Sequence, residues 1–151
     1  MMKRSYRRKK GPVQSKKITY DGITFASGLE RYVYTALKKA KIKALYGGET
    51  FELLESFNFP FESYERCGNS KGDYKNRGNK KIFNIKYTPD FVGKGFIIET
   101  KGRANESFPL RWKMFKKLVA ENKIEPFALY KPQNQKECDK TVELILKKTR
   151  E

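Results

Sequence analysis

The stretch that decides the fold is Tyr87-Thr88-Pro89-Asp90-Phe91-Val92-Gly93-Lys94-Gly95-Phe96-Ile97-Ile98-Glu99-Thr100-Lys101-Gly102. Gly93-Lys94-Gly95 is a turn signal between two apolar segments, so the stretch predicts a β-hairpin. The turn brings Asp90, at the end of one strand, beside Glu99 at the end of the next. Because alternate residues of a strand share a face, Glu99 and Lys101 should project together. We therefore expect two carboxylates and an ammonium to converge there.

This group of side chains suits a hard metal ion. An Asp–Glu pair with a free backbone carbonyl offers the oxygen ligands that Mg²⁺ prefers, and a bound metal can activate water and stabilise charge on a phosphodiester. Lys101 can then orient the water or offset the developing charge. The alternative is a solvated ion pair, which is common for a carboxylate and a lysine two apart on a strand. Ile97 and Ile98 favour a site, because an isolated charge is costly at the end of a buried strand.

Glu30 is a third candidate acid. Ser27-Gly28-Leu29-Glu30 predicts the start of a helix that runs to about Lys41, and its apolar stripe is Leu29, Val33, Ala36, Leu37 and Ala40. In a capping box the Glu30 carboxylate would return to the Ser27 amide. Glu30 also borders the apolar stripe, so its side chain can reach a site on the sheet. The two roles are compatible.

Composition limits the function classes. The chain has 151 residues and a net charge of +17, with 38% hydrophobic residues, which indicates one folded and very basic protein. Nucleic acid is the first partner to expect, and an anionic membrane surface the second. No apolar run is long enough to span a bilayer. The absence of His excludes His-based nucleophilic catalysis and most zinc sites. Cys67 and Cys138 are expected to be free thiols in a reducing cytosol.

The remaining sequence predicts the order α, several β, α, β, α. Residues 1–17 form a basic arm without acidic residues, and residues 18–151 form a single domain. Phenylalanines alternate in the β-like segment 49–64, where Pro60 favours an edge strand or an isolated ribbon. Residues 65–81 are polar, basic and glycine-containing, which predicts a mobile loop inserted in the domain. Pro109 suits the first turn of a second helix, a short strand is expected at 126–130, and Asp139 can cap the last helix.

Three motifs carry a resemblance to a known family. Phe25–Glu30, Tyr87–Phe91 and Ile98–Gly102 resemble, in this order, the bacteriophage endonuclease I family of Holliday-junction resolvases within the PD-(D/E)xK nuclease superfamily. The similarity spans about residues 18–130. It implies an α/β fold with an αβββαβ core, a mixed sheet flanked by helices, and hydrolysis of branched DNA with Mg²⁺ or Mn²⁺. By motif, Asp90 and Glu99 resemble metal ligands, Thr100 would offer its carbonyl, Lys101 would be the catalytic lysine and Glu30 the helix-borne catalytic acid.

The resemblance also implies a homodimer whose chains exchange through an extended β-bridge, so that the counterpart of Glu30 serves the partner's active site. The segment 51–64 resembles that bridge, although a plain edge strand is the alternative. From the residues alone, Glu30 can serve either its own hairpin or its partner's. The insertion at 65–81 departs from the family pattern. Candidate DNA contacts are Lys3, Arg4, Arg7, Arg8, Lys9, Lys10, Arg111 and Lys113, although basic runs on a helix are also typical of solvated faces.

Together with these residues, the resemblance implies a Mg²⁺-dependent, structure-selective endonuclease that cleaves four-way DNA junctions during phage DNA recombination or replication. It also implies a location in the cytoplasm of a bacterial host, and no membrane partner is expected. Two alternatives remain open at this point: a sequence- or mismatch-directed nicking endonuclease of the same superfamily, and a nucleic-acid-binding module without catalysis.

Overall fold

The computed structural model describes residues 16–68, 71–101 and 107–150. Its centre is a four-stranded mixed sheet with the strand order β12-β11-β10-β3. β10 (Phe91–Gly93) and β11 (Phe96–Ile98) form the predicted antiparallel hairpin.

Two further strands complete the sheet. β3 (Ala44–Tyr46) pairs antiparallel with β10, and β12 (Ala128–Tyr130) pairs parallel with β11. A parallel pair needs a crossover connection, and the helix between β11 and β12 provides it.

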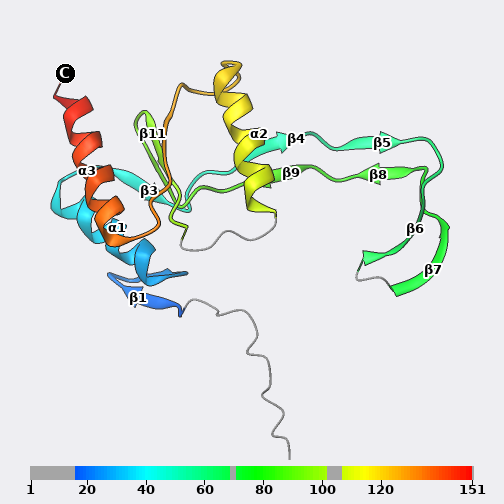
Figure 1. Ribbon diagram of the computed structural model, residues 1–151, viewed down its shortest axis with the longest axis horizontal. Coiled ribbons are helices and arrows are strands. Elements are labelled where there is room, and N and C mark those ends of the chain that lie inside the picture. Colours follow the sequence, from blue (N-terminus) through cyan, green and yellow to red (C-terminus); the bar gives the residue numbers. More distant parts are fainter. Residues whose placement is uncertain (1–15, 69–70, 102–106, 151) are drawn as a thin grey trace, which may run out of the picture.

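Helices cover both faces of this sheet. α1 (Gly28–Lys39) and α3 (Gln135–Thr149) lie together on one side, and α2 (Phe108–Ala120) lies on the other (Figure 1). The hairpin residues alternate between the two layers, as the strand period requires. Phe91, Phe96 and Ile98 pack with the α1–α3 layer, whereas Val92 and Ile97 pack with α2. The fold is therefore mixed α/β. Along the chain, the three helices and the strands of the central sheet follow in the order α1, β3, β10, β11, α2, β12, α3.

The helix starts confirm two predictions and correct one. The Ser27 hydroxyl accepts a hydrogen bond from the Glu30 amide at 3.2 Å, and Pro109 lies in the first turn of α2. The prediction that Asp139 caps the last helix is wrong. Asn134 caps α3 by accepting a hydrogen bond from the Glu137 amide at 2.9 Å. Asp139 lies within the helix, where it accepts a hydrogen bond from the Tyr32 hydroxyl.

A two-stranded ribbon extends from the body (Figure 1). β4 (Phe51–Leu54) pairs with β9 (Ile85–Tyr87), and farther out β5 (Phe57–Phe59) pairs with β8 (Lys80–Ile82). The prediction of β structure in an edge or isolated ribbon around Pro60 is confirmed.

The ribbon ends in a hairpin of β6 (Tyr64–Cys67) and β7 (Lys71–Asn76). The prediction of a loop at residues 65–81 is therefore wrong for the described residues, most of which belong to paired strands. Both strands are exposed along their whole length, so they have no apolar alternation that the sequence could reveal. Across the two strands, the rings of Tyr64 and Tyr74 lie 6.0 Å apart, and Glu65 lies opposite Lys75 in the register. Cross-strand neighbours of these kinds stabilise a sheet.

A small hairpin precedes α1. β1 (Ile18–Tyr20) and β2 (Ile23–Phe25) are joined by Asp21 and Gly22, both at positive φ, as tight hairpin turns require. The predicted arm contacts between Lys3 and Lys10 lie outside the described residues. No helix in the described ranges is long and apolar enough to cross a membrane.

Candidate functional site

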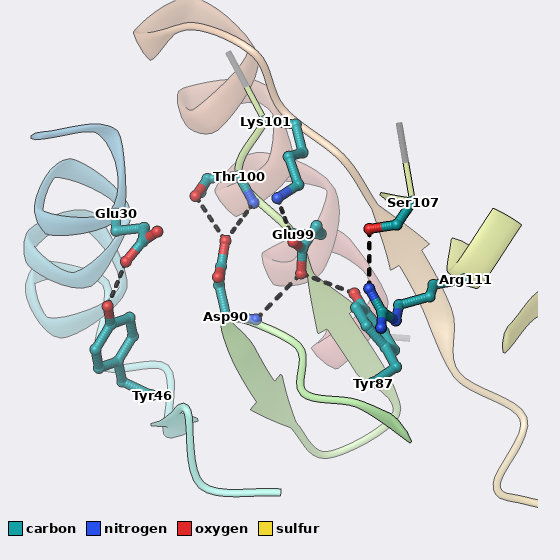
Figure 2. A network of polar contacts seen from close by, with 9 residues as sticks. All are labelled: Glu30, Tyr46, Tyr87, Asp90, Glu99, Thr100, Lys101, Ser107 and Arg111. Atoms are coloured by element: carbon teal, nitrogen blue, oxygen red, sulfur yellow. Dashed lines mark hydrogen bonds and ion pairs between the residues drawn. The ribbon is translucent and has the colours of Figure 1, made fainter. Parts of the chain in front are cut away.

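Two carboxylates meet at the open end of the β10–β11 hairpin. Phe91 lies opposite Ile98, so the next residues outward, Asp90 and Glu99, are neighbours across the strand pair. The Asp90 amide donates a hydrogen bond to Glu99 Oε2 at 3.3 Å. Asp90 Oδ2 accepts hydrogen bonds from the Thr100 amide at 2.8 Å and from the Thr100 hydroxyl at 2.7 Å (Figure 2). The hairpin thus brings Asp90, Glu99 and Thr100 into one network.

Glu99 is held from two sides. It is only 4% exposed, and its Oε2 accepts a hydrogen bond from the buried hydroxyl of Tyr87 at 2.7 Å. Its Oε1 lies 3.3 Å from the Lys101 ammonium. The predicted projection of Glu99 and Lys101 to one side is therefore confirmed, and both oxygens of Glu99 have fixed partners (Figure 2).

Burial makes the negative charges of this pair costly. Burial, followed by the neighbouring charges of Glu99 and Glu30, raises the pKa of Asp90 to about 7. Burial also raises the pKa of Glu99, although the Tyr87 hydrogen bond and the charge of Lys101 oppose the rise. One ammonium therefore compensates the half-buried Asp90 and the buried Glu99 incompletely, and an additional cation would be bound favourably.

The donor set consists of oxygen atoms, which fits Mg²⁺ or Mn²⁺ and not a soft metal. Among residues 16–68, 71–101 and 107–150, no three His, Cys, Asp or Glu side chains are grouped so that they can hold a metal ion. Asp90 and Glu99 could supply two side-chain ligands, and backbone carbonyls and water would complete the shell. Mg²⁺ commonly binds in this way, through one or two carboxylates and several waters.

Glu30 lies on α1 and faces the pair from the same chain (Figure 2). It is 8% exposed, and its Oε2 accepts hydrogen bonds from the Tyr46 hydroxyl and from the Ala26 amide. The capping-box prediction is therefore half right, because Ser27 caps the helix but Glu30 returns to Ala26. Burial, then the hydrogen bond to Glu30, raises the pKa of Tyr46 to about 12, so this phenol remains a donor.

The structure separates the two predicted basic residues of α2. Arg111 is half-buried beside Tyr87, and its Nη1 donates a hydrogen bond to the Ser107 hydroxyl at 2.9 Å. Lys113 is exposed and does not line the space around Glu99. Residues two apart on a helix point in nearly opposite directions, so only Arg111 belongs to the site.

Sequence reasoning missed the two tyrosines. Tyr87 belongs to an alternating apolar run, which favours a core position, and Tyr46 lies in a strand that no motif marks. A buried tyrosine hydroxyl normally has a hydrogen-bond partner, so acidic residues on adjacent strands are the candidates that the sequence offers. For Tyr87 these candidates are Asp90 and Glu99, and the sequence alone does not distinguish between them.

Comparisons with known proteins give one match. Neither the curated proteins nor the solved structures contain a protein that matches this chain. The sequence model of one family matches residues 10–131, which include the hairpin, its two acids, Lys101 and Glu30. The chain therefore belongs to the family described as "Protein of unknown function (DUF1064)".

Proposed function

We propose that this protein is a metal-dependent DNA endonuclease that hydrolyses a phosphodiester at branched, four-way junctions. The observation that carries the proposal is the pair of neighbouring carboxylates, half-buried Asp90 and buried Glu99, with the Lys101 ammonium 3.3 Å from Glu99 Oε1. Carboxylates whose pKa values are raised by burial are typical of functional sites. Along the chain, the first two helices and the strands of the central sheet follow in the order α1-β3-β10-β11-α2-β12, with the ribbon strands between β3 and β10. This order supports a PD-(D/E)xK core, because it is the expected αβββαβ sequence of elements.

The proposed metal is Mg²⁺ or Mn²⁺. Asp90 and Glu99 would hold it through carboxylate oxygens, together with the Thr100 carbonyl. When bound, such an ion supplies an activated water and compensates charge on the phosphodiester.

The residues around the pair have distinct roles in this proposal. Thr100 fixes one oxygen of Asp90 with two hydrogen bonds, and Tyr87 fixes one oxygen of Glu99. Lys101 is one-quarter exposed, so its ammonium can contact a phosphate or the attacking water while it stays near Glu99. Glu30 adds a negative charge at the side of Asp90 and can accept a proton from a water.

The proposed partners are branched DNA and a second copy of the chain. The net charge of +17 favours a polyanion, and the DNA contacts proposed are Arg111, Lys113 and the basic residues of the N-terminal arm. The ribbon exposes large apolar side chains that a lone chain would leave in water, which favours a dimer formed through it. These side chains are Leu54, Phe57, Phe61, Tyr64, Tyr74 and Phe83.

A cleavage assay tests the proposal. A four-way junction, a mismatched duplex and a linear duplex of the same length are incubated with excess protein in Mg²⁺ or in EDTA. We expect cleavage of the junction in Mg²⁺ alone, with the linear duplex left intact. Equal cleavage of all three substrates would refute junction selectivity. Junction binding without any cleavage would instead identify a nucleic-acid-binding module.

A further inference from the structure

A pocket of about 210 Å³ lies beside the Asp90–Glu99 pair, between β9 and the first turn of α2. Its walls are basic, because Lys86, Lys101 and Arg111 line it. Glu99 lies at its border, but Asp90 does not contribute to the lining. The pocket is therefore adjacent to the proposed catalytic pair and displaced from it toward α2.

Arg111 presents an unused donor. Its Nη1 donates to the Ser107 hydroxyl, but its Nε is buried and has no hydrogen-bond partner among the residues that the structure describes. Native proteins seldom leave a buried N–H of a charged group without an acceptor. A guanidinium also offers its donors in a fixed planar fork, which matches the oxygens of a phosphate.

The charges of the pocket also favour an anion. Within the described ranges, Lys86 and Arg111 have no carboxylate partner, whereas Lys101 lies 3.3 Å from Glu99. The negative charge of Glu99 is offset by that ammonium and by the Tyr87 hydrogen bond. Glu52 lies opposite Lys86 in the β4–β9 register, but its Oε2 accepts a hydrogen bond from Asn84. The positive charges of Lys86 and Arg111 therefore form no ion pair among the described residues and remain available to an anion beside the buried Nε of Arg111.

We propose that this pocket binds a DNA backbone phosphate next to the one that is cut, with Arg111 and Lys86 as its ligands. The inference rests on the proposed function, since it assigns the pocket to the same DNA strand. The phosphate that is cut must lie near both Asp90 and Glu99. Arg111 and Tyr87 lie on the side of Glu99 that faces away from Asp90 (Figure 2). A continuous strand supplies a phosphate to both positions, and the second contact would fix the register of the strand.

Inorganic phosphate provides a test that needs neither metal nor cleavage. The Nε–H signal of Arg111 is followed by ¹⁵N NMR while phosphate replaces chloride at constant ionic strength, and Arg111→Lys assigns the signal by its loss. We expect a saturable shift. Lys86→Met should weaken the apparent phosphate affinity several-fold, because it removes one of the two uncompensated charges. Lys86 is exposed, so this variant should keep the fold.

Lys136→Met is the control, because it removes the same charge from an exposed position on α3, outside the pocket and outside the proposed DNA contacts. It should leave the titration unchanged. An unsaturable shift, or equal effects of Lys86→Met and Lys136→Met, would overturn the pocket and indicate only diffuse attraction of anions by a basic protein.

A modified junction then tests the register. A methylphosphonate next to the cleaved position removes one phosphate charge, and it should slow the wild-type protein about tenfold, as expected for a lost charge-assisted hydrogen bond. It should slow Arg111→Lys much less, because the contact is already impaired there. Equal slowing of both proteins would contradict the assignment. If phosphate causes a saturable shift but the protein cleaves no DNA, only the proposed nuclease activity is refuted. If the protein cleaves the junction but phosphate causes no shift, only the proposed phosphate pocket is refuted.

Discussion

The buried hydroxyl of Tyr87 donates a 2.7 Å hydrogen bond to Glu99 Oε2, which links the ribbon strand β9 to the hairpin that carries the site. Burial and the charge of Glu99 hold the pKa of Tyr87 above its ordinary value, so the phenol stays protonated. The bond therefore persists across the neutral pH range and keeps Glu99 in one orientation.

Replacing Tyr87 by Phe should reveal the strength of this bond. The ring keeps its contacts with Trp112 and Phe115, but Glu99 loses a donor inside the protein. A hydrogen bond to a buried charged group is worth about 1.5–3 kcal/mol, and urea unfolding at neutral pH should show a loss of this order. Mg²⁺ affinity should also fall, because Glu99 is no longer oriented.

Tyr32→Phe is the control for this substitution. It removes a hydrogen bond of the same length, 2.7 Å, from the exposed pair Tyr32 and Asp139. We expect a smaller loss of stability and unchanged Mg²⁺ affinity. Equal losses in the two variants would show that the Tyr87 bond has no special role.

The raised pKa of Asp90 predicts how stability depends on pH. The native state keeps the Asp90 proton up to about pH 7, whereas the unfolded chain releases it near pH 4. The native state then binds more protons than the unfolded state between these values, so the free energy of unfolding contributed by this group falls as pH rises. In the metal-free protein, Asp90 should therefore lower the stability measured by thermal unfolding as the pH rises from 4 to 7. The Asp90→Asn variant should lack this contribution of Asp90.

Addition of Mg²⁺ should reverse the effect. The ion competes with the proton for the carboxylates, so it should raise the melting temperature at pH 8 much more than at pH 5. Chelation by EDTA should remove the gain. An equal gain at both pH values, or the same gain in Asp90→Asn, would mean that Mg²⁺ binds elsewhere.

Glu30 and Asp90 of one chain face the same site, so we predict that each site is completed within one chain, without the exchange that the family resemblance implies. Co-refolding a Glu30→Gln chain with an Asp90→Asn chain should therefore yield heterodimers in which each site has one defect. We expect no nicking of a supercoiled cruciform, for which one intact site would suffice. Recovery of nicking in the mixture, with both homodimers inactive, would establish exchange.

The ribbon predicts the oligomeric state. Phe61 and Phe83 are 70% and 76% exposed, so changing both to Ser should disturb no packed core. Sedimentation should show a dimer for the wild type and a monomer for this variant. Leu45→Ser, at a 61% exposed position in β3, is the matched control and should remain dimeric. A monomeric wild type would refute the proposed dimer.

The sequence determined the parts of the structure that depend on local patterns. The turn Gly93-Lys94-Gly95 fixes the hairpin register, so the proximity of Asp90, Glu99 and Lys101 followed from the sequence. Ser27 likewise marked the start of α1. The start of α3 is also decided locally, but the sequence offers two candidate caps. Asn134 caps as well as an aspartate does, and α3 begins at Gln135, before Asp139.

Local sequence patterns could not predict the exposed hairpin β6–β7. They also could not predict the hydrogen bonds of Tyr46 to Glu30 and of Tyr87 to Glu99. A hairpin with two solvated faces has no hydrophobic period, and its charges and glycines are those of a loop. The contact from Tyr46 to Glu30 joins β3 to α1, and only the packing of the sheet against that helix determines it.

The most direct test of the central claim is single-turnover cleavage of a four-way junction by Asp90→Asn in Mg²⁺. Asp139→Asn is the matched control, because it makes the same chemical change at an exposed position of α3. The account predicts that Asp90→Asn cleaves at least about 100-fold more slowly than the wild type, the scale expected for loss of one essential stabilising group, while it binds the junction as tightly or more tightly. Asp139→Asn should cleave normally. Near-wild-type cleavage by Asp90→Asn would contradict the assignment of the active site.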